Sequence, residues 1–141
     1  MPSPMPGLFS GVDASASALS GERLRMTVAA ENLAHAGDTR KPADGLPYAR
    51  QRVLFESVMN GQGQHTGEVR SSVVSSPRYQ QRYDPSHPHA GPDGMVVEPD
   101  IDPILELTDL MVASKAYDAN VNAAKGLVRM HESALRLGQD T

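Results

Sequence analysis

The sequence contains no cysteine and no tryptophan, and it has only two phenylalanines. Without cysteine, the chain can form no disulfide, no thiolate metal site and no cysteine nucleophile. Aromatic side chains supply the largest single contributions of buried area in a core. Because aromatics make up only 4% of the 141 residues, we expect a thin core for a chain of this length. Long helices that each bury one stripe fit this composition, and so does a chain that completes its burial against neighbouring molecules.

Long basic runs and long apolar runs are absent as well. The 13 basic and 17 acidic residues are interspersed, so the chain lacks the basic patch that nucleic-acid binding usually requires. No apolar stretch approaches the roughly 20 residues that span a bilayer. The first seven residues have neither the positive nor the apolar region of a signal peptide. This pattern fits a cytoplasmic protein, or one exported by an apparatus that removes no signal peptide.

The first predicted helix covers residues 10–36. Apolar or small residues recur there at alternating spacings of three and four, the heptad seam of a coiled coil. Ser10 is expected to cap its start and Gly37 to end it in a left-handed conformation. Gly11 and Gly21 lie inside it and each costs about 1 kcal/mol relative to Ala, so we expect this helix to depend on a partner. The seam comprises Phe9, Val12, Ala16, Leu19, Met26, Ala30 and Leu33, with Arg23 in the same register as the exception.

The second predicted helix covers residues 103–137, again with a seam at spacings of three and four. Asp102 is expected to cap its free amides, and Pro103 suits the first helical position because it has no amide to satisfy. Gly138 is expected to close this helix. The seam comprises Leu107, Leu110, Ser114, Tyr117, Val121, Ala124, Val128, His131 and Leu135.

Two helices with matching seams, separated by a long insertion, predict a mainly α fold with a small β or irregular middle. The long N- and C-terminal helices are expected to pair as an antiparallel coiled-coil hairpin. Two ordinary amphipathic helices packed on a globular middle remain the alternative. The corresponding division of the chain is an N-terminal helix at 1–36, a middle segment at 37–102 and a C-terminal helix at 103–141.

The middle segment is rich in Gly and Pro but also contains strand-like runs. Residues 48–55, 68–75 and 78–83 carry β-branched or aromatic residues among charged ones, and residues 59–64 resemble a hairpin connection. We therefore expect a small, twisted antiparallel sheet with long loops. Residues 83–102 are expected to be extended and to lie on the surface.

One group of polar residues could bind a metal ion. His87 and His89, near Asp84 and Asp93, offer imidazole and carboxylate ligands. However, the sequence has no zinc motif of fixed spacing. In an extended His-Pro-His segment, Pro88 fixes the backbone and the two imidazoles are expected to point apart. The segment is therefore interpreted as a plain loop.

The other candidate groups are equally incomplete. The carboxylates Glu98, Asp100 and Asp102 could act in acid–base chemistry or bind calcium, but they lack the Gly and the final Glu of an EF-hand loop. Residues 61–63 lack the Lys-Ser/Thr of a phosphate-binding loop. His35 suits a helix end, where a cation is favourable. We therefore expect no catalytic residue, no cofactor and no metal site.

Several segments, in order, resemble motifs of the flagellar rod and hook protein family. Residues 24–34 (LRMTVAAENLA) are similar to the family's N-terminal signature around Asn-Leu-Ala-Asn, with His35 in place of the second Asn. Residues 106–121 (ELTDLMVASKAYDANV) resemble its C-terminal motif, Ser-Arg-Ala-Tyr-Glu-Ala-Asn. Residues 83–94 (YDPSHPHAGPDG), together with the short length, resemble a member from the proximal rod. Residues 47–51 (PYARQ) also fit the family.

This resemblance covers about residues 8–137 and implies a structural subunit of the bacterial flagellum. The two terminal helices would pair and stack with neighbours into a hollow, helical rod that transmits torque for motility. The partners would be other rod subunits and copies of the chain itself, with the flagellar type III export apparatus during secretion. The rod would lie in the periplasm, reached without a cleaved signal peptide. The family implies no enzymatic activity, cofactor, nucleic acid or small-molecule substrate.

On this interpretation, the assembly contacts are expected along the two helix seams. The residues assigned to them are Met26, Asn32, Leu33, Tyr117, Asn120 and Val121. Three other interpretations stay open. The chain could be a coiled-coil adaptor or chaperone that remains in the cytoplasm, a small metal-dependent hydrolase around His87 and His89, or a subunit of a different rod position within the same family.

Overall fold

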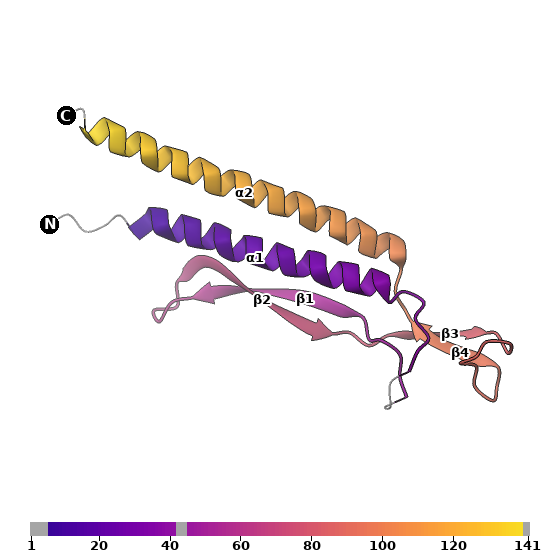
Figure 1. Cartoon of the computed structure of the whole chain (residues 1–141). Coiled ribbons are helices and arrows are strands. Elements are labelled where there is room, and N and C mark those ends of the chain that lie inside the picture. The colour runs from indigo at the N-terminus through magenta and orange to yellow at the C-terminus, as the bar shows by residue number, and fades with distance from the viewer. Residues whose placement is uncertain (1–5, 42–44, 140–141) are drawn as a thin grey trace. The chain divides into compact units, whose positions relative to one another are not determined.

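The computed structural model describes residues 6–41 and 45–139, and within these ranges it has two long helices and four strands. The order is α1 (Pro6–Ala34), β1 (Gln51–Met59), β2 (His65–Ser75), β3 (Tyr79–Tyr83), β4 (Met95–Pro99) and α2 (Pro103–Gln139) (Figure 1). A mainly helical chain with a small antiparallel middle is therefore confirmed. Neither helix, in its described part, has a stretch long and apolar enough to cross a membrane.

The helix ends agree with the sequence only in part. Asp102 caps α2 as predicted, because its Oδ1 accepts a hydrogen bond from the amide two residues on (2.8 Å). Gly37, just after α1, adopts the predicted left-handed conformation with φ 77°. The other two predictions are wrong. α1 begins before Ser10, since Pro6 suits a first helical turn, and α2 continues beyond Gly138.

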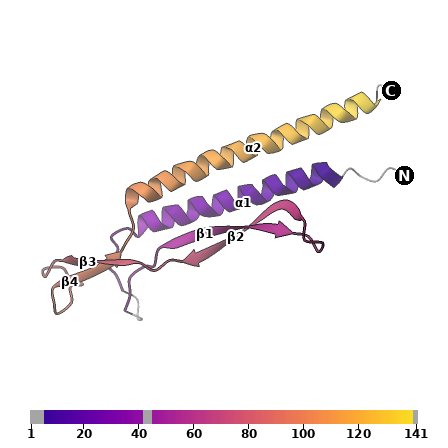
Figure 2. The ribbon, with the colours of Figure 1, turned by 180° about the vertical axis from the view of Figure 1, so that it is seen from behind.

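The strands form two separate two-stranded sheets in the described part of the chain, β1 with β2 and β3 with β4. The hairpin connection predicted at residues 59–64 is confirmed. The amide of Asn60 donates to the carbonyl of Gln64 (2.9 Å), and Gly63 supplies the left-handed residue of the turn with φ 76°. Figure 2 shows this hairpin and the second sheet from behind.

The prediction that residues 83–102 lie on the surface is wrong, although residues 95–99 are extended. β4 lies there and pairs antiparallel with β3, with Tyr79 opposite Pro99. Val96 of β4 is fully buried. Three consecutive apolar residues, Met95 to Val97, are too short a run to predict a strand, so only the pairing with β3 defines this element.

The chain divides into two compact units, and both helices contribute to each. The first unit contains the described residues up to Leu24, residues 55–72 and the described residues from Ala113 onward. The second unit contains the described residues of 25–54 together with 73–112. Its buried apolar side chains are all aliphatic, which agrees with the thin core expected from the composition. They include Val28, Ala29, Val96 and Ile101.

In the first unit, small residues of α1 allow close approach of other elements. Ser17 Oγ accepts a hydrogen bond from an amide of β2 (3.1 Å). A Cβ atom on Gly21 would overlap the ring of Phe55, and one on Gly11 would lie 3.2 Å from Leu127 of α2. The two glycines that weaken the helix locally therefore leave room for its neighbours.

The face of α2 that is buried is not the predicted seam but a neighbouring face of the same helix. Its least exposed residues follow a heptad spacing that we call the inner row: Glu106, Leu110, Ala113, Tyr117, Asn120, Ala124, Leu127 and His131. Four of these belong to the predicted seam, but four other seam residues are exposed, namely Leu107, Ser114, Val128 and Leu135. On α1, the seam residues Ala16, Arg23 and Ala30 are exposed as well. The correction arises because polar Glu106 and Asn120 lie in the inner row, where apolar periodicity cannot detect them.

Candidate assembly interface

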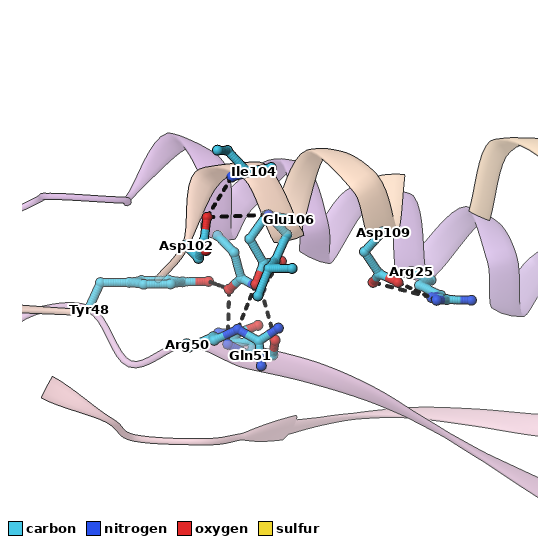
Figure 3. A network of polar contacts seen from close by, with 10 residues as sticks. Arg25, Tyr48, Arg50, Gln51, Asp102, Ile104, Glu106 and Asp109 are labelled. Atoms are coloured by element: carbon cyan, nitrogen blue, oxygen red, sulfur yellow. Dashed lines mark hydrogen bonds and ion pairs between the residues drawn. The ribbon is translucent and has the colours of Figure 1, made fainter. Parts of the chain in front are cut away.

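A buried polar cluster joins the end of α1 to the start of β1 and the start of α2 (Figure 3). At its centre is Asn32, which is only 1% exposed. The Asn32 amide nitrogen donates to the carbonyl of Gln51 (2.9 Å) and to Glu106 Oε2 (3.1 Å). Its oxygen accepts from the amide of Gln51 (2.9 Å) and from the hydroxyl of Tyr48 (3.0 Å). All four hydrogen-bonding positions of the buried amide are therefore used.

Glu106 carries a buried charge in this cluster from the first turn of α2. Its side chain is 2% exposed, and its Oε1 accepts a hydrogen bond from Arg50 Nε (2.6 Å). With Asn32 on the other oxygen, both oxygens of the carboxylate have a partner. Leaving a buried charge without its partner is strongly destabilising. The carboxylate therefore holds two segments that are distant in sequence to the start of α2.

An aromatic stack borders the cluster on the side of the turn after α1. The rings of His35 and Tyr48 are stacked, with centroids 4.2 Å apart. His35 Nδ1 lies 3.1 Å from Asp38 Oδ2, and the Arg40 guanidinium beside Asp38 holds the pKa of that carboxyl well below its usual range. Burial raises the pKa of Tyr48, and nearby carboxylates add to the effect. The phenol therefore stays protonated, and it can donate within the cluster over the whole neutral range.

A second ionic contact joins the helices within the same unit. The Arg25 guanidinium donates to both carboxylate oxygens of Asp109, with Nε 3.3 Å from Oδ2 (Figure 3). This two-point arrangement fixes direction as well as distance. Because both side chains are about one-third exposed, the pair contributes less stability than its geometry alone would suggest.

Apolar side chains that stay exposed gather along α2. At its start, Ile104 is 75% exposed, and Met111, two turns on, is 54% exposed. Farther along, Val128 and Leu135 are 47% and 54% exposed. Together with Leu107 the last two follow a heptad spacing, which we call the outer row: Leu107, Ser114, Val121, Val128 and Leu135. Leu107, Val128 and Leu135 are the exposed apolar members of this row, and exposed apolar patches mark interaction sites in folded proteins.

The six residues assigned to assembly from the sequence lie in different surroundings. Asn32 is buried in the polar cluster, whereas the other five are half-buried. Three of the six belong to the second unit and to α1: Met26, Asn32 and Leu33. The remaining three belong to the first unit and to α2: Tyr117, Asn120 and Val121. Of these, Tyr117 and Asn120 lie in the inner row and Val121 in the outer row.

The two histidines of the loop before β4 do not point apart as expected. The rings of His87 and His89 lie edge to face with centroids 5.5 Å apart. The amide of His89 donates to His87 Nδ1 (3.0 Å), and the Nδ1 atom of His89 lies 2.9 Å from Thr39 Oγ1. Among the residues that the structure describes, no three His, Asp or Glu side chains gather as metal ligands. The pair connects the loop to the segment after α1.

An open cleft of about 300 Å³ lies beside the polar cluster in the second unit. Three arginines and three carboxylates contribute to its lining: Arg50, Arg52, Arg78, Asp100, Asp102 and Glu106. With equal numbers of opposite charges, the cleft has no excess charge that would attract a small ion. Asp102 is already used as the cap of α2. The geometry therefore favours a structural role for these side chains.

Sequence analysis missed Tyr48, Arg50 and Glu106 as members of one site. Arg50 and Asn32 lie 56 and 74 residues from Glu106 in the chain, so local patterns hold no record of these contacts. One signal was available: Glu106 is charged but lies at the spacing of the inner row. Because a charged residue is rarely buried without a partner, this position indicates a buried contact.

No protein-family model matches the chain. Several known proteins, however, are similar to it over most of their length. The flagellar basal-body rod protein FlgC of Bacillus subtilis is 34% identical over 147 residues, covering 93% of this chain and 98% of the relative. The protein of the same name from Salmonella typhimurium is 37% identical over 129 residues, covering 90% and 95%. That of Borreliella burgdorferi is 32% identical over 152 residues, covering 94% and 99%. Because the similarity extends through both helices and the segment between them, the chain belongs to the family of flagellar basal-body rod proteins FlgC.

Proposed function

We propose that the chain is a structural subunit of the flagellar basal-body rod and serves bacterial motility. Its relatives are named as basal-body rod proteins, and the observation that supports the same role here is the outer row of α2. Its exposed apolar members are Leu107 near the start of the 37-residue helix and Val128 and Leu135 toward its end. Covering each of them contributes up to about 1.5–3 kcal/mol, so the isolated subunit has a strong tendency to associate.

Within the subunit, the two helices act as an antiparallel coiled-coil hairpin. In the second unit, Asn32 meets Glu106 and Arg25 meets Asp109, so rising numbers on α1 correspond to falling numbers on α2. In the first unit, Leu127 lies over Gly11. The inner row has the heptad spacing that such pairing requires. For this role the chain divides into residues 1–36, which contain α1, a middle segment at 37–102 and residues 103–141, which contain α2.

The six residues assigned to assembly have two roles in this proposal. Asn32 acts through the subunit's own fold, because its buried amide holds the start of α2 in place. The half-buried residues contact neighbouring subunits with the parts of their side chains that remain accessible. These are Met26, Leu33, Tyr117, Asn120 and Val121. Heterologous contacts that repeat along the rod generate a helical assembly able to transmit torque.

The finer placement is a position in the proximal rod, within the periplasm. The partners are other rod subunits and copies of the chain. The subunit reaches the rod through the flagellar export apparatus, with no signal peptide removed. The chain has no catalytic activity and needs no cofactor, metal, nucleic acid or small-molecule substrate for this role. The motif similarity of residues 83–94 and the relatives' names support this placement.

Mass spectrometry of purified hook–basal bodies from the source bacterium tests the proposal directly. We expect the chain to be present after washing harsh enough to remove loosely bound proteins, with its N-terminal peptide uncleaved. Intact structures without the chain, and recovery only from the cytosolic fraction, would instead identify a cytoplasmic adaptor.

Substitutions on α2 test the outer row. Val128→Asp introduces a charge into the row, whereas Ala119→Asp introduces the same charge at another exposed position of the same helix. We expect Val128→Asp to abolish incorporation into the basal body and swimming, and Ala119→Asp to have a much smaller effect. Circular dichroism of both purified variants should match the parent protein, because neither position is buried. Equal incorporation of the two variants would remove the outer row as an assembly surface.

The seam residues are tested in the same assay. We expect Leu33→Asp and Tyr117→Ala each to reduce incorporation, because both side chains are half-buried along the helices. Normal assembly and rotation of both variants would show that the seams are not needed.

A further inference from the structure

The tip of the β1–β2 hairpin carries the sequence Asn60-Gly61. The backbone nitrogen that follows an asparagine can attack the side-chain amide. Glycine is the residue that hinders this attack least, because it has no Cβ and moves freely in φ and ψ. The chain contains four asparagines, at positions 32, 60, 120 and 122, and only Asn60 precedes a glycine. The hairpin tip is therefore the position where this chemistry has the fewest steric obstacles.

The structure leaves the reacting atoms accessible. Asn60 and Gly61 are both exposed, and a Cβ atom placed on Gly61 would meet no atom within 4 Å. Both residues of the reaction are therefore open to water and dissolved base, and no side chain crowds the position of a Gly61 Cβ.

The turn also polarises the side-chain amide. Asn60 Oδ1 accepts hydrogen bonds from the backbone amides of Gln62 (3.0 Å) and Gln64 (2.9 Å). Two N–H donors on one carbonyl oxygen draw electron density from Cγ. They also stabilise the negative charge that develops on the oxygen when a nucleophile adds. The turn thus supplies part of what an oxyanion hole supplies in an enzyme.

None of the other three asparagines combines these features. Asn32 is buried, so solvent base and water do not reach it. Asn120 and Asn122 lie inside α2, where the backbone conformation is fixed by the helix. They provide internal references within the same molecule.

We propose that Asn60 is a site of spontaneous deamidation in the folded protein. The Gly61 nitrogen gives its proton to solvent base and forms a bond to Asn60 Cγ, while the bond from Cγ to Nδ2 breaks and ammonia leaves. The product is a five-membered succinimide. Water then adds to one of its two carbonyl carbons and opens the ring to aspartate or isoaspartate. One water molecule enters and one ammonia leaves, with no change of oxidation state.

The reaction alters the hairpin in two ways. Either product adds one negative charge at the tip. Isoaspartate also inserts a methylene group into the main chain between the Asn60 amide and the rest of the turn. The hydrogen bonds from Asn60 to the Gln64 carbonyl and from Gly63 to the Asn60 carbonyl then lose their present geometry.

Peptide mapping by mass spectrometry after incubation of the purified chain at mildly alkaline pH tests the proposal. In ¹⁸O-labelled water, we expect Asn60 to convert with one labelled oxygen per molecule. The rate should be at least roughly tenfold higher than at Asn122, because only position 60 precedes the permissive residue glycine. Equal rates at the two positions would overturn the proposal, and so would conversion in the urea-unfolded chain but not in the folded one.

Gly61→Ala is a matched control variant. Gly61 is not among the glycines with positive φ, and the space around it is open, so alanine fits the turn without strain. We expect the hairpin to be retained, while conversion at Asn60 slows by roughly tenfold because the added Cβ hinders the attack. Conversion at the parent rate in this variant would show that the succinimide route is not the one in use.

Discussion

Replacing Asn32 by aspartate changes one NH₂ group into an oxygen at the centre of the buried cluster. The side chain keeps its size, but it can no longer donate to the Gln51 carbonyl (2.9 Å) or to Glu106 Oε2 (3.1 Å). Each lost hydrogen bond removes about 1 kcal/mol of net stability, and the unsatisfied buried acceptor adds a further penalty. The variant also places a second carboxylate against that of Glu106. Since disrupting a buried charge network costs about 3–5 kcal/mol, we expect a loss of about 3–4 kcal/mol near neutral pH.

The pH dependence separates this electrostatic cause from simple loss of packing. In the variant, burial and the neighbouring carboxylate of Glu106 raise the folded-state pKa of the introduced aspartate above its unfolded value of about 3.9. A raised carboxyl pKa contributes stability below the unfolded pKa and loses it as pH rises through the folded pKa. The stability deficit of the variant should therefore be smallest near pH 4 and grow toward neutrality. At low pH, a proton shared between the two carboxyls partly restores the missing donor.

Urea unfolding followed by circular dichroism at several pH values measures this deficit. Asn122→Asp, at an exposed position of α2, is the matched control, and it should change the free energy of unfolding by less than about 0.5 kcal/mol. If Asn32→Asp were as stable as the parent protein near neutral pH, the cluster would not stabilise the fold. A deficit that is constant from pH 4 to 7 would refute the argument from charge repulsion.

Two further predictions concern the same fold. Tyr48→Phe removes the hydroxyl that donates to Asn32 and should cost about 1 kcal/mol near neutral pH. Because the pKa of Tyr48 is raised in the fold, its contribution should vanish as pH rises through that pKa, above about 10, and urea titrations of parent and variant should converge there. Gly126→Ala should raise the melting temperature, because a Cβ there meets open space and alanine gains up to about 1 kcal/mol in a helix. Gly21→Ala should lower the melting temperature, because its Cβ would overlap Phe55. If thermal melts showed an equal rise in melting temperature for both variants, the packing of Phe55 against α1 would be contradicted.

Local patterns in the sequence determined the elements that depend on local chemistry. The apolar periodicity predicted both helices, and Asp102 caps α2 because a short acidic side chain reaches the free amides of its own helix. Gly37 and Gly63 adopt left-handed conformations that glycine tolerates best. In each case the residues that define the structure are neighbours in the chain. The family motifs, in their order along the chain, likewise identified the family, because such signatures are properties of the sequence itself.

The tertiary structure alone decided which face of α2 is buried. Apolar periodicity selected Leu107 and Val128, whereas the fold buries Glu106 and exposes both of these. A carboxylate can take an inner-row position only because Arg50 and Asn32, far away in the sequence, supply its hydrogen bonds. No local pattern contains that information.

The same reason explains the two other features that the sequence did not predict. β4 exists because β3 pairs with it and because its Val96 is buried, and a five-residue strand has little propensity of its own. In the sequence, Gly21 indicates only a weaker helix. The structure shows that the Phe55 ring occupies the space where a Cβ on residue 21 would lie. The sequence by itself determined the helices, the cap at Asp102 and the left-handed Gly37, the hairpin turn and the family. Only the tertiary structure decided burial and partners, because the energy of a buried polar or close-packed group depends on atoms brought together from distant parts of the chain.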